Sequence, residues 1–245
     1  FTIRGKALYS QMDFLFQMTE EILNTSKLSD TRRLGEIIGE IRSRGQASLI
    51  GAGHQTAVLR SAAYGSPMAE YQDEMAGVGY YKFIEDLEKN FQEKKDEIVA
   101  GLQNAMAEII RKDSFMVSYT GERESVEQVK ALSGALKESL PESTCEVPET
   151  AIICRKKNEG FKTSGQVQYV ARTGNFVKKG FTYTGALEIL KVALSYDYLW
   201  INLRVKGGAY GCISGFKRSG ESYFVSYRDP HLRRTLEIYE GVPEY

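Results

Sequence analysis

The sequence contains little of what zinc-binding and disulfide-bonded proteins use. Its 245 residues include two histidines and three cysteines. Neither His54 nor His231 occurs in the HxxEH or HExxH spacing that places two imidazoles and a carboxylate around zinc. The cysteines form no CxxC pair and are odd in number, which argues against a structural zinc site and a disulfide framework. We therefore expect no metal in this chain, and reduced, mostly buried thiols at Cys145, Cys154 and Cys212.

A net charge and long apolar runs are also missing. Lys and Arg together number 32, as do Asp and Glu, and the longest basic cluster is only residues 155–157. A balanced chain has no net field that favours nucleic acid or an anionic membrane. No stretch approaches the roughly 18 apolar residues of a membrane helix. We expect a soluble protein that binds neither nucleic acid nor membrane, in a reducing compartment: a bacterial cytoplasm, with an organelle matrix as the alternative.

The chain begins at Phe1 without an initiator Met or a signal-peptide core. We expect it to be part of a longer protein. Its 42% hydrophobic and 26% charged residues are globular composition, enough to bury a core.

Residues 1–112 are predicted to be helical. Ser29 or Asp30 is the expected N-cap of the second helix, and Pro67 and Gly77 separate later ones. Apolar residues recur at helical spacing in four stretches: Leu8, Met12, Leu15 and Ile22; Leu34, Ile37, Ile38 and Ile41; Phe83, Ile84, Leu87 and Phe91; Ile98, Leu102, Met106 and Ile109.

Residues 113–245 show a different pattern, in which apolar residues alternate with polar ones. Strands are predicted at 114–119, 151–154, 166–171 and 222–227. Helices are predicted at Val126 to Leu136 and along a stripe of five residues: Leu187, Leu190, Leu194, Tyr198 and Ile201. The polar segment 137–150 is expected to be a loop. The predicted fold is α+β, with helices on one face of a mostly antiparallel sheet and a helix-rich N-terminal part.

The segment LRVKGGAYGC, residues 203–212, is not a phosphate-binding loop. In such loops the glycines precede a helix, whose amino end faces the phosphate. Here they follow a helix, whose carboxyl end repels anions. Gly207 and Gly208 are explained as a helix C-cap before a strand. Gly51 and Gly53 are likewise explained by close helix packing, with His54 as a packing residue whose hydrogen bonds are satisfied.

Arg204 and Tyr210 are the candidate functional pair of this segment. Arg204 falls on the last helical turn and Tyr210 at the start of the next strand, so both side chains can point to one side of the turn. A guanidinium and a phenol together can donate hydrogen bonds to a carbonyl oxygen or to the oxyanion formed from it. No GxSxG motif or evident Cys-His pair supplies a nucleophile. His231 is assigned to the first turn of the last helix, capped by Asp229.

Three separated segments resemble the C-terminal half of the presequence-protease branch of the pitrilysin/insulinase metallopeptidases. They are residues 33–67, residues 160–176, and residues 203–212 followed by 222–245. The resemblance covers nearly the whole chain, and the segments agree in order.

The resemblance implies a zinc endopeptidase in which two halves enclose a chamber that degrades unfolded peptides. The N-terminal half, absent here, carries the inverted zinc motif HxxEH. It implies that Arg204 and Tyr210 are catalytic, holding the scissile carbonyl and the tetrahedral intermediate. Gly207, Gly208 and Gly211 are then substrate-binding, because they let backbone lie close to an extended peptide. Zinc is implied for the full-length enzyme and not for this chain, which is expected to be inactive by itself.

Two alternatives stay open at this point. The chain can be a catalytically inert relative that serves as a peptide-binding or assembly subunit. It can also be an unrelated α+β scaffold in which residues 203–212 form only a turn.

Overall fold

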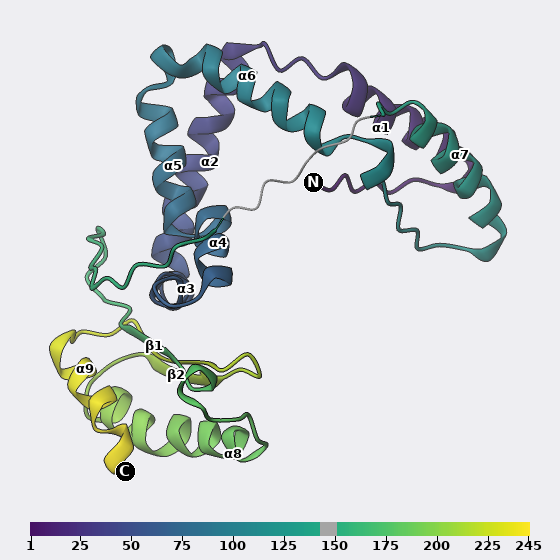
Figure 1. Cartoon of the computed structure of the whole chain (residues 1–245). Helices are drawn as coiled ribbons and strands as arrows, with labels where there is room; N and C mark the ends of the chain where they lie inside the picture. Colours follow the sequence, from purple (N-terminus) through teal and green to yellow (C-terminus); the bar gives the residue numbers. More distant parts are fainter. Residues whose placement is uncertain (143–150) are drawn as a thin grey trace. The chain divides into compact units, whose positions relative to one another are not determined.

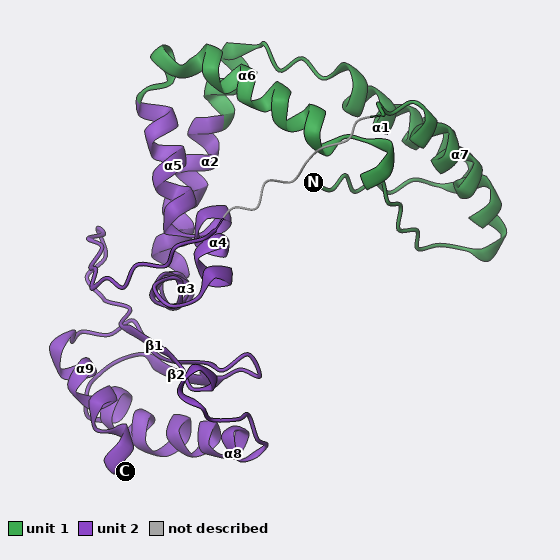
Figure 2. Cartoon of the chain, in the orientation of Figure 1, with its two compact units in different colours: residues 1–37, 90–149 green, residues 38–89, 150–245 purple. Residues whose placement is uncertain are grey.

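The chain forms two compact units in a computed structural model that describes residues 1–142 and 151–245. The units consist of residues 1–37 with 90–149 and of residues 38–89 with 150–245 (Figure 2). The expected division at residue 112 separates the chain by type of secondary structure rather than by contacts, and it stays a prediction.

The first unit is helical. Its helices are α1 (Met12–Thr25), α6 (Phe91–Ile109), α7 (Val126–Glu138) and the start of α2 (Thr31–Gly51). The helices α1 and α7 lie side by side (Figure 1). Asp30 caps α2, because its Oδ1 accepts a hydrogen bond from the backbone N of Arg33 at 3.0 Å. The predicted helix from Val126 to Leu136 is confirmed.

The predicted strand at 114–119 is wrong. Ser114 ends a 3₁₀ turn, and in the described residues the segment after it pairs with no strand. Met116 is 89% exposed. An alternating pattern becomes a strand only where a neighbouring strand takes its hydrogen bonds. Of the expected loop 137–150, residues 137 and 138 belong to α7, whereas 143–150, with Cys145, lie outside the described residues.

The second unit begins with the rest of α2 and three further helices. These are α3 (Gly53–Ala63), α4 (Pro67–Ala76) and α5 (Val78–Lys89). Ser66 caps α4, whose first residue is Pro67 as the sequence pattern indicated. Short 3₁₀ turns occur elsewhere in the chain, at Tyr9–Gln11, Lys112–Ser114, Arg123–Ser125, Val177–Lys179 and Val242–Glu244.

A three-stranded antiparallel sheet follows in the same unit. Its strands are β1 (Ala171–Asn175), β2 (Gly211–Phe216) and β3 (Glu221–Tyr227), in the order β1-β3-β2. The predicted strand at 222–227 is confirmed. The one at 166–171 is displaced, since only Gln168 forms a bridge, to Asp229, before β1 starts. Residues 151–154 form no strand.

The sheet lies between two layers of helices (Figure 1). One face packs on helix 186–205 and on α9 (Arg233–Glu240), and α3 lies against the other. The α+β class is confirmed, and α3 adds a second covered face. The main core cluster consists of Val170, Leu194, Leu199, Leu203, Ala209 and Tyr239.

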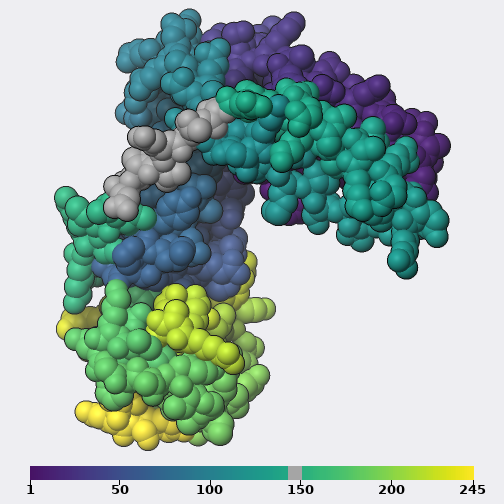
Figure 3. Space-filling view, turned by 45° about the vertical axis from the view of Figure 1, so that its right-hand side comes forward, coloured from purple at the N-terminus to yellow at the C-terminus, as the bar shows by residue number. Residues whose placement is uncertain are grey.

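The last helix starts later than predicted. Asp229 is 1% exposed, and its two oxygens accept hydrogen bonds from the His231 backbone N at 2.8 Å and the Thr235 Oγ1 at 2.6 Å. This turn occupies Pro230 and His231, so α9 begins only at Arg233. The C-terminal residues, yellow in Figure 3, lie against helix 186–205, where the Tyr245 hydroxyl donates to Asp197.

Candidate active site at the end of helix 186–205

Helix 186–205 is partly π-helical. It begins as α8 (Ala186–Ala193) and continues as the π segments Leu194–Tyr198 and Trp200–Val205. Its buried residues are Leu194, Leu199 and Leu203. The predicted stripe was therefore wrong at Leu190 and Ile201, which are 42% and 37% exposed, because a wider turn moves the buried face along the sequence.

Side chains of β2 hold this wider winding. The Ser214 and Ser195 hydroxyls lie 2.9 Å apart, and Ser214 Oγ also lies 3.4 Å from the Lys191 carbonyl oxygen. The Cys212 thiol donates to the Ser195 carbonyl at 3.9 Å. Burial raises the pKa of Cys212 to about 11, so the thiol stays protonated as a donor. Cys154 and Cys212 are free and half-buried, which confirms reduced thiols and corrects their expected deep burial.

The two glycines end the helix, as predicted. Gly208 has φ +78, its N donates to the Arg204 carbonyl at 3.0 Å, and the Ala209 N donates to the Leu203 carbonyl at 2.9 Å. This is a Schellman-like end in which each bond spans one residue more than usual, in keeping with the π winding. A Cβ on Gly207 would lie 2.5 Å from the Leu203 carbonyl oxygen, so only glycine fits there.

Replacing Gly208 by Ala is expected to destabilise the chain by about 1–2 kcal/mol, the cost of a left-handed residue with a Cβ. The matched Gly211→Ala is expected to cost nothing, because its Cβ would meet only the Tyr227 Cβ at 3.7 Å. Urea unfolding of both variants measures the difference. Equal losses of stability would show that the left-handed conformation of Gly208 is not what matters.

Arg204 and Tyr210 lie together, as their spacing suggested. The Arg204 Nη1 donates to the Tyr210 carbonyl oxygen. The guanidinium carbon lies 4.4 Å from the centre of the Trp200 ring and 5.7 Å from that of Tyr210. Tyr210 is 65% exposed, and its hydroxyl forms no hydrogen bond within the described residues. The remaining guanidinium N–H groups and the phenol are thus available to an external acceptor.

An aromatic cluster supports Tyr210 from the sheet and from α3. The Tyr210 backbone N donates to the Tyr227 carbonyl at 2.9 Å, and the two rings lie 6.4 Å apart. Tyr227 in turn meets His54 edge-on at 5.0 Å, and Tyr169 at 5.6 Å. Sequence reasoning missed Tyr227 and Trp200, although pairing β2 with β3 outward from the turn at Gly220 places Tyr227 beside Tyr210.

His54 was assigned a packing role with satisfied hydrogen bonds, and the second half of that assignment was wrong. It packs on Tyr169 and Tyr227, but its buried Nδ1 has no hydrogen-bond partner among the described residues. Gly53 does serve close packing, since a Cβ there would lie 2.3 Å from the Tyr169 ring. Gly51 has open space around it and does not.

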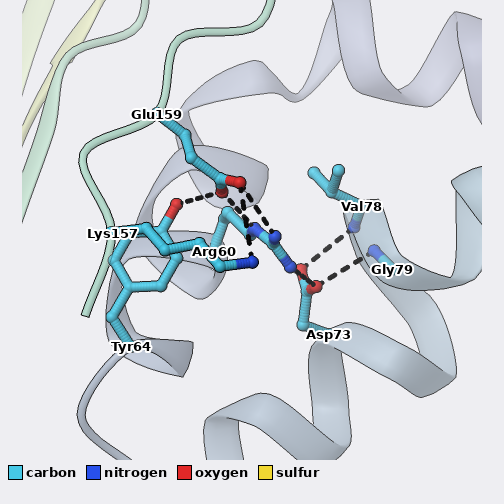
Figure 4. A network of polar contacts seen from close by, with 7 residues as sticks. All are labelled: Arg60, Tyr64, Asp73, Val78, Gly79, Lys157 and Glu159. Atoms are coloured by element: carbon cyan, nitrogen blue, oxygen red, sulfur yellow. Dashed lines mark hydrogen bonds and ion pairs between the residues drawn. The ribbon is translucent and has the colours of Figure 1, made fainter. Parts of the chain in front are cut away.

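A second polar cluster fixes the loop before β1 onto α3 and α4 (Figure 4). Arg60, 8% exposed, donates from Nη1 to Asp73 at 2.7 Å and from Nε to Glu159 at 2.8 Å. The hydrogen bond from Arg60 lowers the pKa of Glu159 to about 2. The pKa of Tyr64 is raised to about 12 by burial and by its bond to Glu159. The loop is therefore held by side chains and not by a strand ladder.

The Glu159 carboxylate is expected to make stability depend on pH. Its pKa is depressed from an ordinary 4.5, so its contribution is fully present above pH 4.5 and is lost as pH falls toward about 2. The difference in unfolding free energy between the wild type and Glu159→Gln should thus shrink over that interval. Urea titrations at several pH values measure it. A difference that stays constant down to the lowest pH would contradict the shift.

The described residues do not fit a catalytic zinc ion. Within residues 1–142 and 151–245, no three His, Cys, Asp or Glu side chains gather where they could bind a metal. Over the same residues, no helix is both long and apolar enough to cross a membrane.

Two family models match the chain. One describes a domain associated with subfamily C of the pitrilysin-type peptidases and matches residues 1–87, and the other, "PreP C-terminal domain", matches residues 158–245. Protein HypA of Clostridium perfringens is 38% identical over 99% of this chain. Presequence protease 1, chloroplastic/mitochondrial, of Arabidopsis thaliana is 28% identical, also over 99%. The chain belongs to the presequence-protease branch of the pitrilysin/insulinase family.

This member spans only part of its relatives. It covers 25% of HypA, 23% of the Arabidopsis protein, and 25% of the mitochondrial presequence protease of Yarrowia lipolytica, to which it is 27% identical. The match to "PreP C-terminal domain" includes Arg204, Tyr210 and the strands β1 to β3. The candidate site therefore lies inside the part of the chain that carries the family assignment.

Proposed function

We propose that this chain is the non-zinc half of a zinc-dependent endopeptidase that degrades unfolded peptides in a closed chamber. The observation that carries the proposal is the pairing of Arg204 and Tyr210 at an exposed helix end, with donors left unused. Such donors stabilise the negative charge that develops on a carbonyl oxygen under attack. The match to presequence proteases supports peptides as the substrates.

In this proposal the chain binds and orients the peptide. The Arg204 guanidinium is held in place by Trp200 and the Tyr210 carbonyl, so little freedom is lost when it meets the scissile carbonyl. Gly208 and Gly211 leave room beside Tyr210 for an extended backbone, whereas Gly207 is buried and contributes by ending the helix. Zinc, bound by the upstream half, supplies the activated water.

Hydrolysis of a quenched fluorescent, unstructured peptide by the full-length protein tests this proposal. We expect hydrolysis that a chelator abolishes and added zinc restores. A folded full-length protein that binds the peptide without cleaving it would instead support the inert peptide-binding subunit. Cleavage that resists the chelator would contradict the zinc assignment.

A further inference from the structure

Arg228, the residue after β3, has an unusual backbone. Its φ is +49, and it is the non-glycine residue with a left-handed conformation in the described part of the chain. Glycine or asparagine adopts this conformation more easily than arginine, and strained residues of this kind concentrate at functional sites. The sequence therefore keeps a long cationic side chain where the backbone favours a small residue.

The position of Arg228 ties it to the candidate site. Its carbonyl oxygen lies 3.3 Å from the Tyr210 backbone N, which also donates to the Tyr227 carbonyl. Its guanidinium carbon lies 5.8 Å from the centre of the Tyr227 ring, and that ring contacts Tyr210. Arg228 is exposed and, among the described residues, pairs with no carboxylate. It is thus a cation beside Tyr210 that nothing in the described chain neutralises.

The surrounding charges are cationic as well. Residues 204–210 lie beside 227–234, since Pro230 Cγ lies 3.7 Å from the site of a Cβ on Gly208 and Arg234 donates to the Lys206 carbonyl at 3.3 Å. Together the two segments present Arg204, Lys206, Arg228 and Arg234. Asp229 is buried and its two oxygens are occupied, while Arg233 is paired with Glu237 at 3.3 Å. An anion is the complement of this rim.

We propose that Arg228 binds a carboxylate of the peptide held at Arg204 and Tyr210, and so determines specificity. The inference rests on the proposed peptide-binding function. The carboxylate can come from an Asp or Glu side chain or from the C-terminus of a peptide, because a guanidinium recognises either by the same paired hydrogen bonds.

Arg228→Gly separates the side chain from the backbone, because glycine adopts φ +49 without strain. In the full-length protein, the wild type should prefer an unstructured peptide with Glu over the same peptide with Gln, or a free C-terminus over an amide. Arg228→Gly should reduce that preference in KM by about three- to thirtyfold, the range for an exposed to a partly desolvated charged hydrogen bond. Its thermal stability should equal or exceed that of the wild type.

Arg218→Gly is the matched control, since it removes an exposed arginine from the turn at the far end of the same hairpin and should retain the preference. Arg228→Lys should retain part of it. A KM that rises equally for the acid and neutral peptides would overturn the proposal in favour of a structural role. Fluorescence anisotropy with the same peptides measures binding without cleavage. An Arg228-dependent preference in binding but no hydrolysis would support the Arg228 site and contradict the peptidase; no preference in either assay would overturn the Arg228 site alone.

Discussion

Arg204→Ala in the full-length protein is expected to lower kcat for peptide hydrolysis by on the order of ten- to a thousandfold, as the loss of one oxyanion donor does. The arginine is exposed and rests on Trp200, so its loss removes the donor without opening the core. Tyr210→Phe removes only a hydroxyl that is 65% exposed with its ring. A similar fall in kcat, with little change in stability, is expected for it.

Tyr196→Phe is the control for the phenol, because Tyr196 is 75% exposed on the same helix but belongs to α8's continuation away from the loop. Steady-state kinetics with an unstructured peptide measures kcat and KM separately. If both site variants matched the wild type in kcat, the oxyanion role would be wrong. A rise in KM alone would reduce the pair to ground-state binding.

Asp73→Ala is expected to cost about 3–5 kcal/mol of stability, the range for breaking a buried ion pair from one side. Asp73 is 0% exposed. Its carboxylate accepts the Arg60 Nη1 at 2.7 Å and the backbone N of Val78 and of Gly79, each at 3.0 Å. Its loss leaves a buried guanidinium with one remaining carboxylate, Glu159, and removes the cap of α5 (Figure 4).

The matched control is Glu74→Ala, which removes an exposed carboxylate from the next position of α4 and should change stability by less than about 0.5 kcal/mol. Asp73→Asn should fall between the two, because the amide oxygen still accepts a backbone hydrogen bond. Urea unfolding followed by circular dichroism measures all three. A loss for Asp73→Ala no larger than that of the control would show that the buried pair is dispensable.

Sequence reasoning was sound where the chemistry is local. The end of helix 186–205 and the proximity of Arg204 and Tyr210 follow from adjacent glycines and a spacing of six residues. Asp30 as a cap and strand β3 are local in the same sense. The catalytic roles of the pair remain predictions, since proximity alone does not establish them.

The parts that failed depend on distant partners. The π winding is held by Ser214 and Cys212 on β2, and nothing in residues 186–205 alone indicates it. The extended segments at 114–119 and 151–154 have strand-like patterns but no neighbouring strand in the described chain. The ion pair between Arg60 and Glu159 joins residues 99 apart, beyond the reach of any periodicity.

The most direct test of the central claim is complementation. This purified chain and the separately expressed upstream half are mixed and tested for hydrolysis of a quenched fluorescent, unstructured peptide, each alone and together. The account predicts activity only in the mixture, lost on adding a chelator and strongly reduced when this chain carries Arg204→Ala. Chelator-resistant activity from this chain alone, or no activity in a mixture shown to associate, would contradict it.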